Sequence, residues 1–261
     1  MGATITVREV IKQASVLLQD TVPQFSRQPE AEMVDWLNEG QLFIASMLPL
    51  ASSGIYSIKL AAGSLQSIEA IPAVDVIPAD GSTLSAPLYG TQVLRLICNM
   101  GASGTAAGAP IRLVPIEVKD SQNPTWRSVA KAYVDEYCYD PSTPKQFENS
   151  PAVTGTVWVR AALNVQPIRV PNTGTPGSEL YAASGSNATK ISLADEYAQM
   201  LVNLIVARSN MRETEWADRN KADYFSSLVL GQLNAKVAAI TGNNPNLRTL
   251  PFAPQPVGQA A

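Results

Sequence analysis

The most constraining feature of this sequence is a change of hydrophobic period along the chain. Apolar residues recur at helical spacing near both ends, whereas the middle alternates between apolar and polar residues and is interrupted by glycines and prolines. These patterns are typical of helices at the two ends and of antiparallel strands between them. Because an amphipathic helix must bury its apolar face, we expect the helices from the two ends to pack on one another.

Two helices are predicted near the start of the chain. The first begins at Thr6, where Thr6 and Glu9 have the spacing of a capping box. The second begins at Pro29, a residue favoured at the start of a helix, and ends at Pro49. The spacing therefore predicts two consecutive amphipathic helices joined by a short loop.

Two further helices are predicted near the end of the chain. One begins at Ser192, which has the side chain of an N-cap and is followed three residues later by Asp195. The last runs from about Thr214 to Ile240, and Gly242 provides a C-cap.

Strand-like runs fill the region between the two pairs of helices. They comprise residues 55–60, 65–71, 91–98, 111–118 and 156–160. Two long segments with almost no charge, residues 101–109 and 171–190, interrupt the region. We expect both segments to be flexible loops.

Together these patterns predict an α+β fold. The N- and C-terminal helices, residues 1–50 and 191–242, are expected to pack as one antiparallel helical bundle. An antiparallel β region, residues 51–190, is inserted between them. Residues 243–261 contain four prolines and one charge, Arg248. Proline disfavours a helix and favours an extended backbone, so this segment is predicted to be an extended C-terminal arm.

The amino-acid composition excludes several classes of function. The sequence has no histidine, which excludes Ser-His-Asp and Cys-His catalysis and histidine-ligated zinc. The two cysteines, Cys98 and Cys138, are too few for a metal cage or a disulfide framework, and we expect both to be reduced and buried. We predict no catalytic, cofactor-binding or metal-binding residues.

The charge and hydropathy of the chain limit the kinds of partner that it is expected to bind. Charged residues make up 16% of the chain and the net charge is −3, compared with about 25% charged residues in ordinary globular domains. This balance provides no basic surface for wrapping nucleic acid. A surface with so few charges is either unusually neutral or covered by other protein. No apolar run is long enough to span a membrane, and no signal peptide is visible at the start.

Two segments could be interpreted as catalytic or ligand-binding. The glycine-rich stretch 101–108 suggests a phosphate loop, but it lacks the Gly-Lys-Ser/Thr ending and precedes a strand, so a hairpin is favoured. Asp135, Glu136 and Asp140 form the densest acidic cluster outside a helix start. Such carboxylates suit a hard metal ion or a hydrolase, but their spacing matches no calcium loop, and a solvated or interface surface is favoured.

Charged residues on the predicted helices have a simpler interpretation. Asp35 and Glu39 lie four residues apart, like an acid/base pair, but their neighbours place them on the polar side of an amphipathic helix. A basic stripe near the C-terminus is interleaved with acidic residues, which predicts a salt-bridged helix surface. The stripe consists of Arg208, Arg212, Arg219 and Lys221, and its acidic neighbours are Glu213, Glu215, Asp218 and Asp223.

Several short motifs occur in a fixed order along the chain. They are Leu18-Gln19-Asp20, Trp36-Leu37-Asn38-Glu39-Gly40, Gly63-Ser64-Leu65-Gln66, Pro124-Thr125-Trp126 and Asp195-Glu196-Tyr197. No single motif is specific. Their co-linear order over about residues 5–240 resembles the head-to-tail adaptor (connector) proteins of short-tailed bacteriophages.

The resemblance implies a structural role without catalytic residues, cofactors or metals. Such adaptors form a homo-oligomeric ring, usually a dodecamer, beneath the portal protein and above a tail or nozzle protein. Genomic DNA passes through the lumen without sequence-specific binding, and a near-neutral or acidic lining would avoid retaining it. The implied location is the head–tail junction of the virion, after assembly in the cytoplasm of the bacterial host. No membrane is involved.

The resemblance also suggests a role for the C-terminal arm. Its apolar side chains are too few to form a core of their own, so we expect the arm to dock onto the portal or a neighbouring adaptor subunit. The candidate docking residues are Leu247, Arg248, Leu250 and Phe252. Two alternatives remain open: another neck or tail-completion ring protein of the stopper type, and a hydrolase that uses Asp135, Glu136 and Asp140.

Overall fold

The structure is a computed structural model that describes residues 4–19, 28–84, 86–171, 189–212 and 217–243. The chain divides into two compact units. The helical unit comprises Met1–Ala51 and Ile168–Ala261, and the strand unit comprises Ser52–Pro167. The helical unit is therefore built from two separate stretches of chain, and the strand unit from one.

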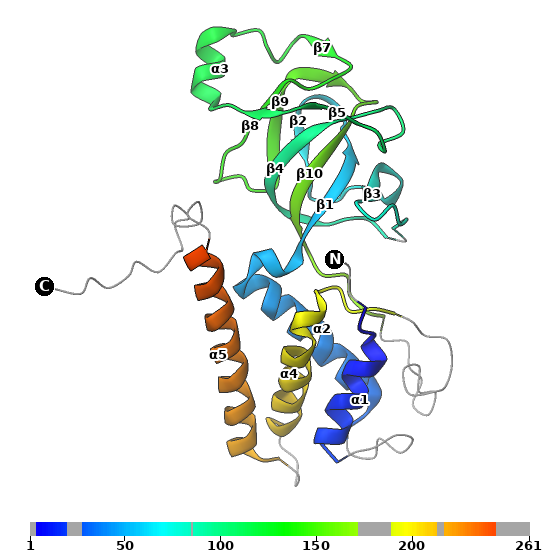
Figure 1. The fold of residues 1–261 in the computed structure, drawn as a ribbon, viewed down its shortest axis with the longest axis vertical. Coiled ribbons are helices and arrows are strands. Elements are labelled where there is room, and N and C mark those ends of the chain that lie inside the picture. Colours follow the sequence, from blue (N-terminus) through cyan, green and yellow to red (C-terminus); the bar gives the residue numbers. More distant parts are fainter. Residues whose placement is uncertain (1–3, 20–27, 85, 172–188, 213–216, 244–261) are drawn as a thin grey trace, which may run out of the picture. The chain divides into compact units, whose positions relative to one another are not determined.

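The described residues of the helical unit form four α-helices, which Figure 1 labels. They are α1 (Val7–Leu17), α2 (Glu30–Met47), α4 (Ala198–Asn210) and α5 (Arg219–Asn243). A short 3₁₀ helix, η3 (Asp195–Tyr197), leads into α4. Another, η1 (Pro49–Ser52), follows α2.

The starts of the first two helices agree with the sequence. The hydroxyl of Thr6 accepts the Glu9 N–H at 3.3 Å, and the Glu9 carboxylate accepts the Thr6 N–H at 2.8 Å. The predicted capping box is therefore confirmed. Pro29 is the N-cap of α2. Ser192, in contrast, does not cap a helix, because α4 begins only at Ala198.

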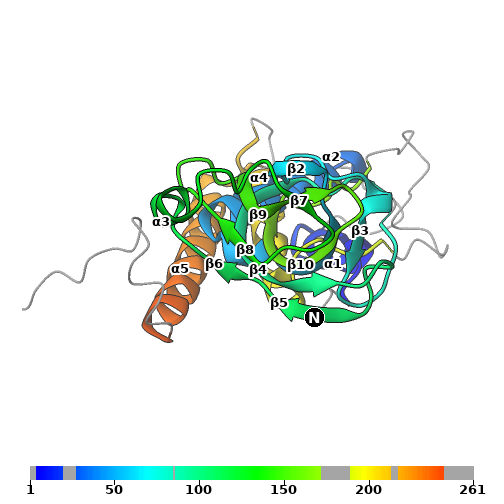
Figure 2. The same cartoon turned by 90° about the horizontal axis from the view of Figure 1, so that it is seen from above.

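The expected single antiparallel bundle of N- and C-terminal helices is wrong. Helix α4 is the common partner: α1, α2 and α5 each pack on it, while α1 and α2 contact each other far less. Both views place α4 between α1 and α5 (Figures 1 and 2). The physical reason is that α4 is buried on nearly all sides, with ten of its 13 residues buried, so it offers several packing faces instead of one stripe.

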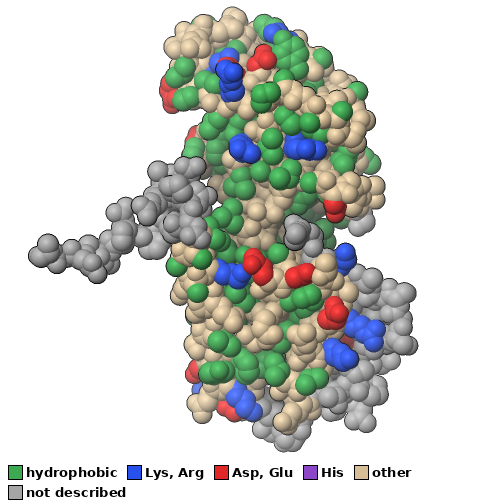
Figure 3. All heavy atoms as spheres, in the orientation of Figure 1, with side chains coloured by type: hydrophobic (Ala, Val, Ile, Leu, Met, Phe, Trp, Pro, Cys, Tyr) green, Lys and Arg blue, Asp and Glu red, His purple; other side chains and the backbone are tan. Residues whose placement is uncertain are grey.

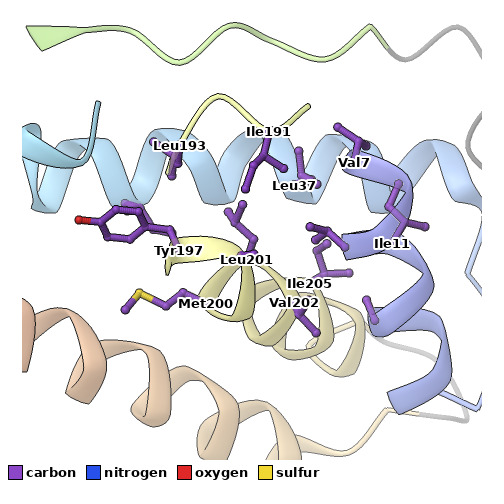
Figure 4. Packing of buried hydrophobic residues seen from close by; sticks show 14 of the residues in the cluster. Val7, Ile11, Leu37, Ile191, Leu193, Tyr197, Met200, Leu201, Val202 and Ile205 are labelled. Atoms are coloured by element: carbon purple, nitrogen blue, oxygen red, sulfur yellow. The ribbon is translucent and has the colours of Figure 1, made fainter. Parts of the chain in front are cut away.

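The core of the helical unit forms around α4 (Figure 4). Figure 4 shows Val7 and Ile11 of α1 and Leu37 of α2 in the same cluster as buried side chains of α4. Leu201 and Ile205 of α4 are completely buried there. The backbone just before η3 supplies two more core residues, Ile191 and Leu193.

The strand unit contains two sheets. The first has the order β3-β1-β10-β4-β5, and the second the order β2-β9-β8-β6, with β7 paired to β9. The strands of the first sheet are β1 (Ser53–Lys59), β3 (Val76–Pro78), β4 (Gly90–Met100), β5 (Ala107–Pro110) and β10 (Trp158–Val165). Those of the second are β2 (Ala62–Ser67), β6 (Arg112–Leu113), β7 (Ala130–Lys131), β8 (Glu136–Cys138) and β9 (Gln146–Thr154).

The strand unit departs from an all-antiparallel region. β6 pairs with β8, and β7 with β9, in parallel orientation. The predicted strand 111–118 is also wrong, because only Arg112–Leu113 is a strand and helix α3 (Ile116–Gln122) follows. Pro115 is the N-cap of α3, and a proline before a helix is a start signal that the strand prediction missed. The general α+β class agrees with the structure, in which the described strands outnumber the α-helices.

The two sheets share one hydrophobic core. It combines Val159 and Leu163 of β10 with Tyr137 and Phe147 of the second sheet. The rings of Tyr137 and Phe147 meet edge to face at 6.4 Å.

The glycine-rich segment 101–109 belongs to a β-hairpin. Gly101 N–H bonds to Ala106 O at 2.7 Å, and β5 then pairs with β4. Gly104 has a φ of +74°, and an added Cβ would lie 2.8 Å from the Trp158 ring. Glycine is therefore required at this turn. The segment therefore forms the turn and the return strand of the hairpin that the sequence favours.

Candidate functional site

The acidic cluster of the sequence does not form one site. Glu136 pairs with Lys119 of α3. Asp140 accepts the Ser142 hydroxyl at 2.7 Å and the Ser142 N–H at 2.8 Å, and these bonds lower the pKa of Asp140. The carboxylates of Glu136 and Asp140 are thus used in separate local contacts. Within the described residues, no three potential metal ligands gather in one place.

The charges on the helices form ion pairs between elements. Asp35 lies 3.2 Å from Arg169, and Glu39 lies 3.5 Å from Arg208, so the two acids do not act as a pair. Arg212 likewise lies 2.5 Å from Glu32. Arg208 and Arg212 of the predicted basic stripe therefore both pair with acidic residues of α2. The sequence predicted neighbouring acids as partners and missed these, since the partners lie more than 160 residues away.

The motif at residues 36–40 joins three parts of the helical unit. Leu37 is fully buried, and Trp36 packs against the same core with the Arg212 guanidinium 5.8 Å from its ring. At Gly40, an added Cβ would lie 3.2 Å from both Leu201 and Leu204. Gly40 therefore allows close packing of α2 on α4.

Two buried amides of α2 hold the backbone on either side of segment 171–190. The Asn38 amide donates to Val170 O at 2.9 Å and accepts the Val170 N–H at 2.8 Å. Gln41 accepts the Ser192 N–H at 2.7 Å. Both side chains are buried, so they satisfy backbone groups that would otherwise lack partners.

The motif at residues 195–197 binds the backbone just before α1. The Asp195 carboxylate accepts the N–H groups of Thr4 at 2.7 Å and Ile5 at 2.9 Å, and the Thr4 hydroxyl at 2.5 Å. The bond from Ile5 contributes most to the lowered pKa of Asp195. Burial raises the pKa of Tyr197 to about 12.

In the strand unit, polar side chains also bind backbone groups and buried side chains. Gln66 accepts the Ala61 N–H at 2.8 Å and donates to Ala61 O at 2.9 Å. The Trp126 indole is 2% exposed and donates to Asp120 at 2.9 Å, while Arg127 lies 4.3 Å from its ring. These described motif residues therefore fix backbone and core packing.

The cysteines are also structural. Cys98 and Cys138 are both free and buried, as the sequence indicates. Burial raises the pKa of the Cys138 thiol, which disfavours the reactive thiolate.

An apolar groove lies between α2, α4 and α5 in the described part of the helical unit. Its volume is about 170 Å³. We call it the apolar groove; its lining includes Trp36, Phe43, Leu204, Met211, Val229 and Leu230. Several lining side chains are exposed, including Met211 at 50% and Leu230 at 44%. Exposed apolar side chains around a groove are typical of a protein-binding surface.

The surface around these elements carries few charges. On the face seen in Figure 3, charged side chains occur singly or in small groups with wide neutral areas between them. The predicted docking residues Leu247, Arg248, Leu250 and Phe252 lie outside the described residues. None of the described helices is long and apolar enough to cross a membrane.

A comparison with protein-family models matches residues 5–248 to the family described as SU10 adaptor protein. A search of curated proteins found no match. The family match spans nearly the whole chain and includes every motif on which the resemblance to phage adaptors rests. The chain therefore belongs to the SU10 adaptor family, consistent with a phage head-to-tail adaptor family, and its role is that of a structural phage adaptor protein.

Proposed function

We propose that this protein forms a ring at the head–tail junction of the virion, joins the portal protein to a tail or nozzle protein, and lets DNA pass through its lumen. The family match over residues 5–248 is the observation that carries the proposal. The resemblance to short-tailed phage adaptors adds the expected dodecamer.

The surface of the helical unit supports a role in assembly. Eight large apolar side chains of its helices and their ends are exposed: Val16, Leu17, Leu42, Phe43, Met47, Met211, Tyr224 and Leu230. A subunit buried on two sides by its neighbours needs fewer solubilising charges, which accounts for the low charge of 16%. The net charge of −3 supports DNA passage, because the chain carries no general excess of positive charge that would bind phosphate.

We also propose that residues 243–261 form the arm that attaches the ring. Leu247, Leu250 and Phe252 would provide the apolar contacts to the portal or to a neighbouring subunit, with Arg248 as the single charge. Fully extended, a segment of this length reaches about 60 Å, enough to cross to another protein.

The test is reconstitution with DNA-filled heads that lack tails. Purified protein should co-sediment with these heads, and electron microscopy should show a ring of density at the portal vertex. A chain ending at residue 242 should remain folded but fail to attach. Heads that gain no density from the full-length protein would refute the adaptor role, and normal attachment of the truncated chain would refute the role of the arm.

A further inference from the structure

One end of helix α1 forms an exposed apolar ridge. Val16 is 57% exposed and Leu17 is 50% exposed, both in the last turn of α1. That turn contains no basic residue, and the acidic residue of α1 is in its first turn. We call Val16 and Leu17 the α1 ridge. Two adjacent exposed aliphatic side chains at a neutral helix end are suited to insertion into an apolar surface.

The α1 ridge and the apolar groove lie on opposite flanks of the helical unit. Val202 of α4 borders a second, open groove beside the ridge, whereas Leu204 of α4 lines the apolar groove. Because successive residues of a helix turn by about 100°, these two side chains point about 160° apart. The ridge therefore cannot reach the groove of its own subunit.

The dimensions and charge of the two surfaces match. A cavity of about 150 Å³ lined by aliphatic and aromatic side chains holds a benzene molecule, so the apolar groove of about 170 Å³ holds one large aliphatic side chain. Glu39 and Arg208 on the rim already pair with each other at 3.5 Å. A neutral groove with its rim charges paired favours a neutral insert over a charged peptide.

A second groove borders the ridge. It lies between α1 and α4, has a volume of about 540 Å³, and is also bordered by Lys12 and Gln13. Leu230 lines the apolar groove and is exposed, so a ridge that enters the apolar groove of a second copy comes close to Leu230 of that copy.

We propose that the α1 ridge of one copy of this chain docks into the apolar groove of a second copy. Because the two surfaces differ and lie on opposite flanks, the contact is heterologous, and repeating it generates a ring when the rotation closes. The inference rests on the proposed function, since it names the subunit contact of that ring, but it can be tested separately.

The test is cross-linking between two single-cysteine variants of the full-length chain. Leu17→Cys and Leu230→Cys proteins are mixed, treated with a short bismaleimide, and analysed for covalent heterodimers. Both positions are exposed, so the variants should fold. The native thiols are shielded, since Cys98 is 8% and Cys138 is 3% exposed. The matched control pairs Leu17→Cys with Val74→Cys, at a residue of the strand unit that is 83% exposed.

Docked thiols have a much higher effective concentration than colliding ones, so the Leu17→Cys and Leu230→Cys mixture should yield about tenfold more heterodimer than the control. The doubly substituted chain should give a ladder of oligomers. Equal yields for mixture and control would overturn the proposal, as would a product cross-linked only within one chain.

The same cross-linking reaction, carried out on DNA-filled heads, distinguishes the proposed subunit contact from the proposed adaptor role. If the wild-type chain co-sediments with heads but the variants bound to those heads do not cross-link above the control, the subunit contact is wrong and the adaptor role stands. If the cross-link forms in solution but the wild-type chain never binds heads, the contact stands and the adaptor role is wrong.

Discussion

The side-chain amide of Asn38 bonds to both the N–H and the carbonyl of Val170, at 2.8 and 2.9 Å. A single buried side chain thus replaces the two backbone partners that a neighbouring strand would provide. The two residues are 132 positions apart, so this bond links the two separate stretches of the helical unit. It gives the asparagine of the 36–40 motif a structural role.

Replacing Asn38 with Ala should lower the free energy of unfolding by about 1–3 kcal/mol, because both backbone groups of Val170 lose their partner in a buried setting. Urea denaturation measures the change. Asn234→Ala, at an exposed position of α5, is the matched control and should stay within about 0.5 kcal/mol of wild type. Equal effects of the two substitutions would contradict the role of Asn38.

Gly40 and Gly231 provide a matched pair for helix packing. Gly231→Ala should stabilise the protein by up to about 1 kcal/mol, since alanine is the better helix former and an added Cβ there meets nothing within 4 Å. Gly40→Ala should instead lose stability, because its Cβ would press on Leu201 and Leu204 at 3.2 Å. Thermal unfolding of both variants compares them. A stabilised Gly40→Ala protein would show that α2 does not depend on close approach to α4.

Asp195 should make stability depend on acid pH. Its pKa is lowered by the bonds from Ile5 and Thr4, so the folded state binds its proton less readily than the unfolded state. The stabilisation is therefore present above the ordinary pKa of an aspartate, about 3.9, and is lost as the pH falls through the lower folded-state pKa.

The Asp195→Asn variant tests this dependence. It should be less stable than wild type at pH 7, and the difference should shrink below about pH 4. Denaturation curves at several pH values between neutral and acid measure the difference. A gap that stays constant throughout would mean that the Asp195 charge contributes nothing.

The two motif tryptophans should differ in their contribution to stability. Trp126 is 2% exposed and its indole has a hydrogen-bond partner, so Trp126→Ala should cost roughly 3–5 kcal/mol. Trp36 is only partly buried. Its replacement by Ala should therefore lower the free energy of unfolding by less, because less packing is lost and a smaller cavity remains. Denaturant titration of both variants gives the order, and a larger loss at Trp36 would contradict it.

Local signals in the sequence predicted local structure well. The Thr6–Glu9 capping box and the start of α2 after Pro29 follow from residues that are neighbours in the chain. The arrangement of the helices did not follow, because four apolar stripes are compatible with several packings. The central position of α4 depends on its being buried on nearly all sides.

The candidate site was harder to predict from sequence. The bonds that Asn38 and Asp195 make reach 132 and 191 residues along the chain, and no local pattern indicates such partners. The apolar groove likewise draws side chains from three helices. In the sequence, Phe43 and Leu230, which line the groove, cannot be distinguished from other apolar residues of amphipathic helices.

The division of the helical unit between two stretches of chain affects the order of synthesis. Helix α1 begins at Val7, but its main partner α4 begins at Ala198. At the usual 5–20 residues per second, α1 leaves the ribosome roughly 10–40 s before α4. The strand unit, which is continuous in sequence, can be completed during this interval. The nascent chain therefore keeps the apolar faces of α1 and α2 without their partner until α4 has been synthesised, which makes them a natural target for chaperones.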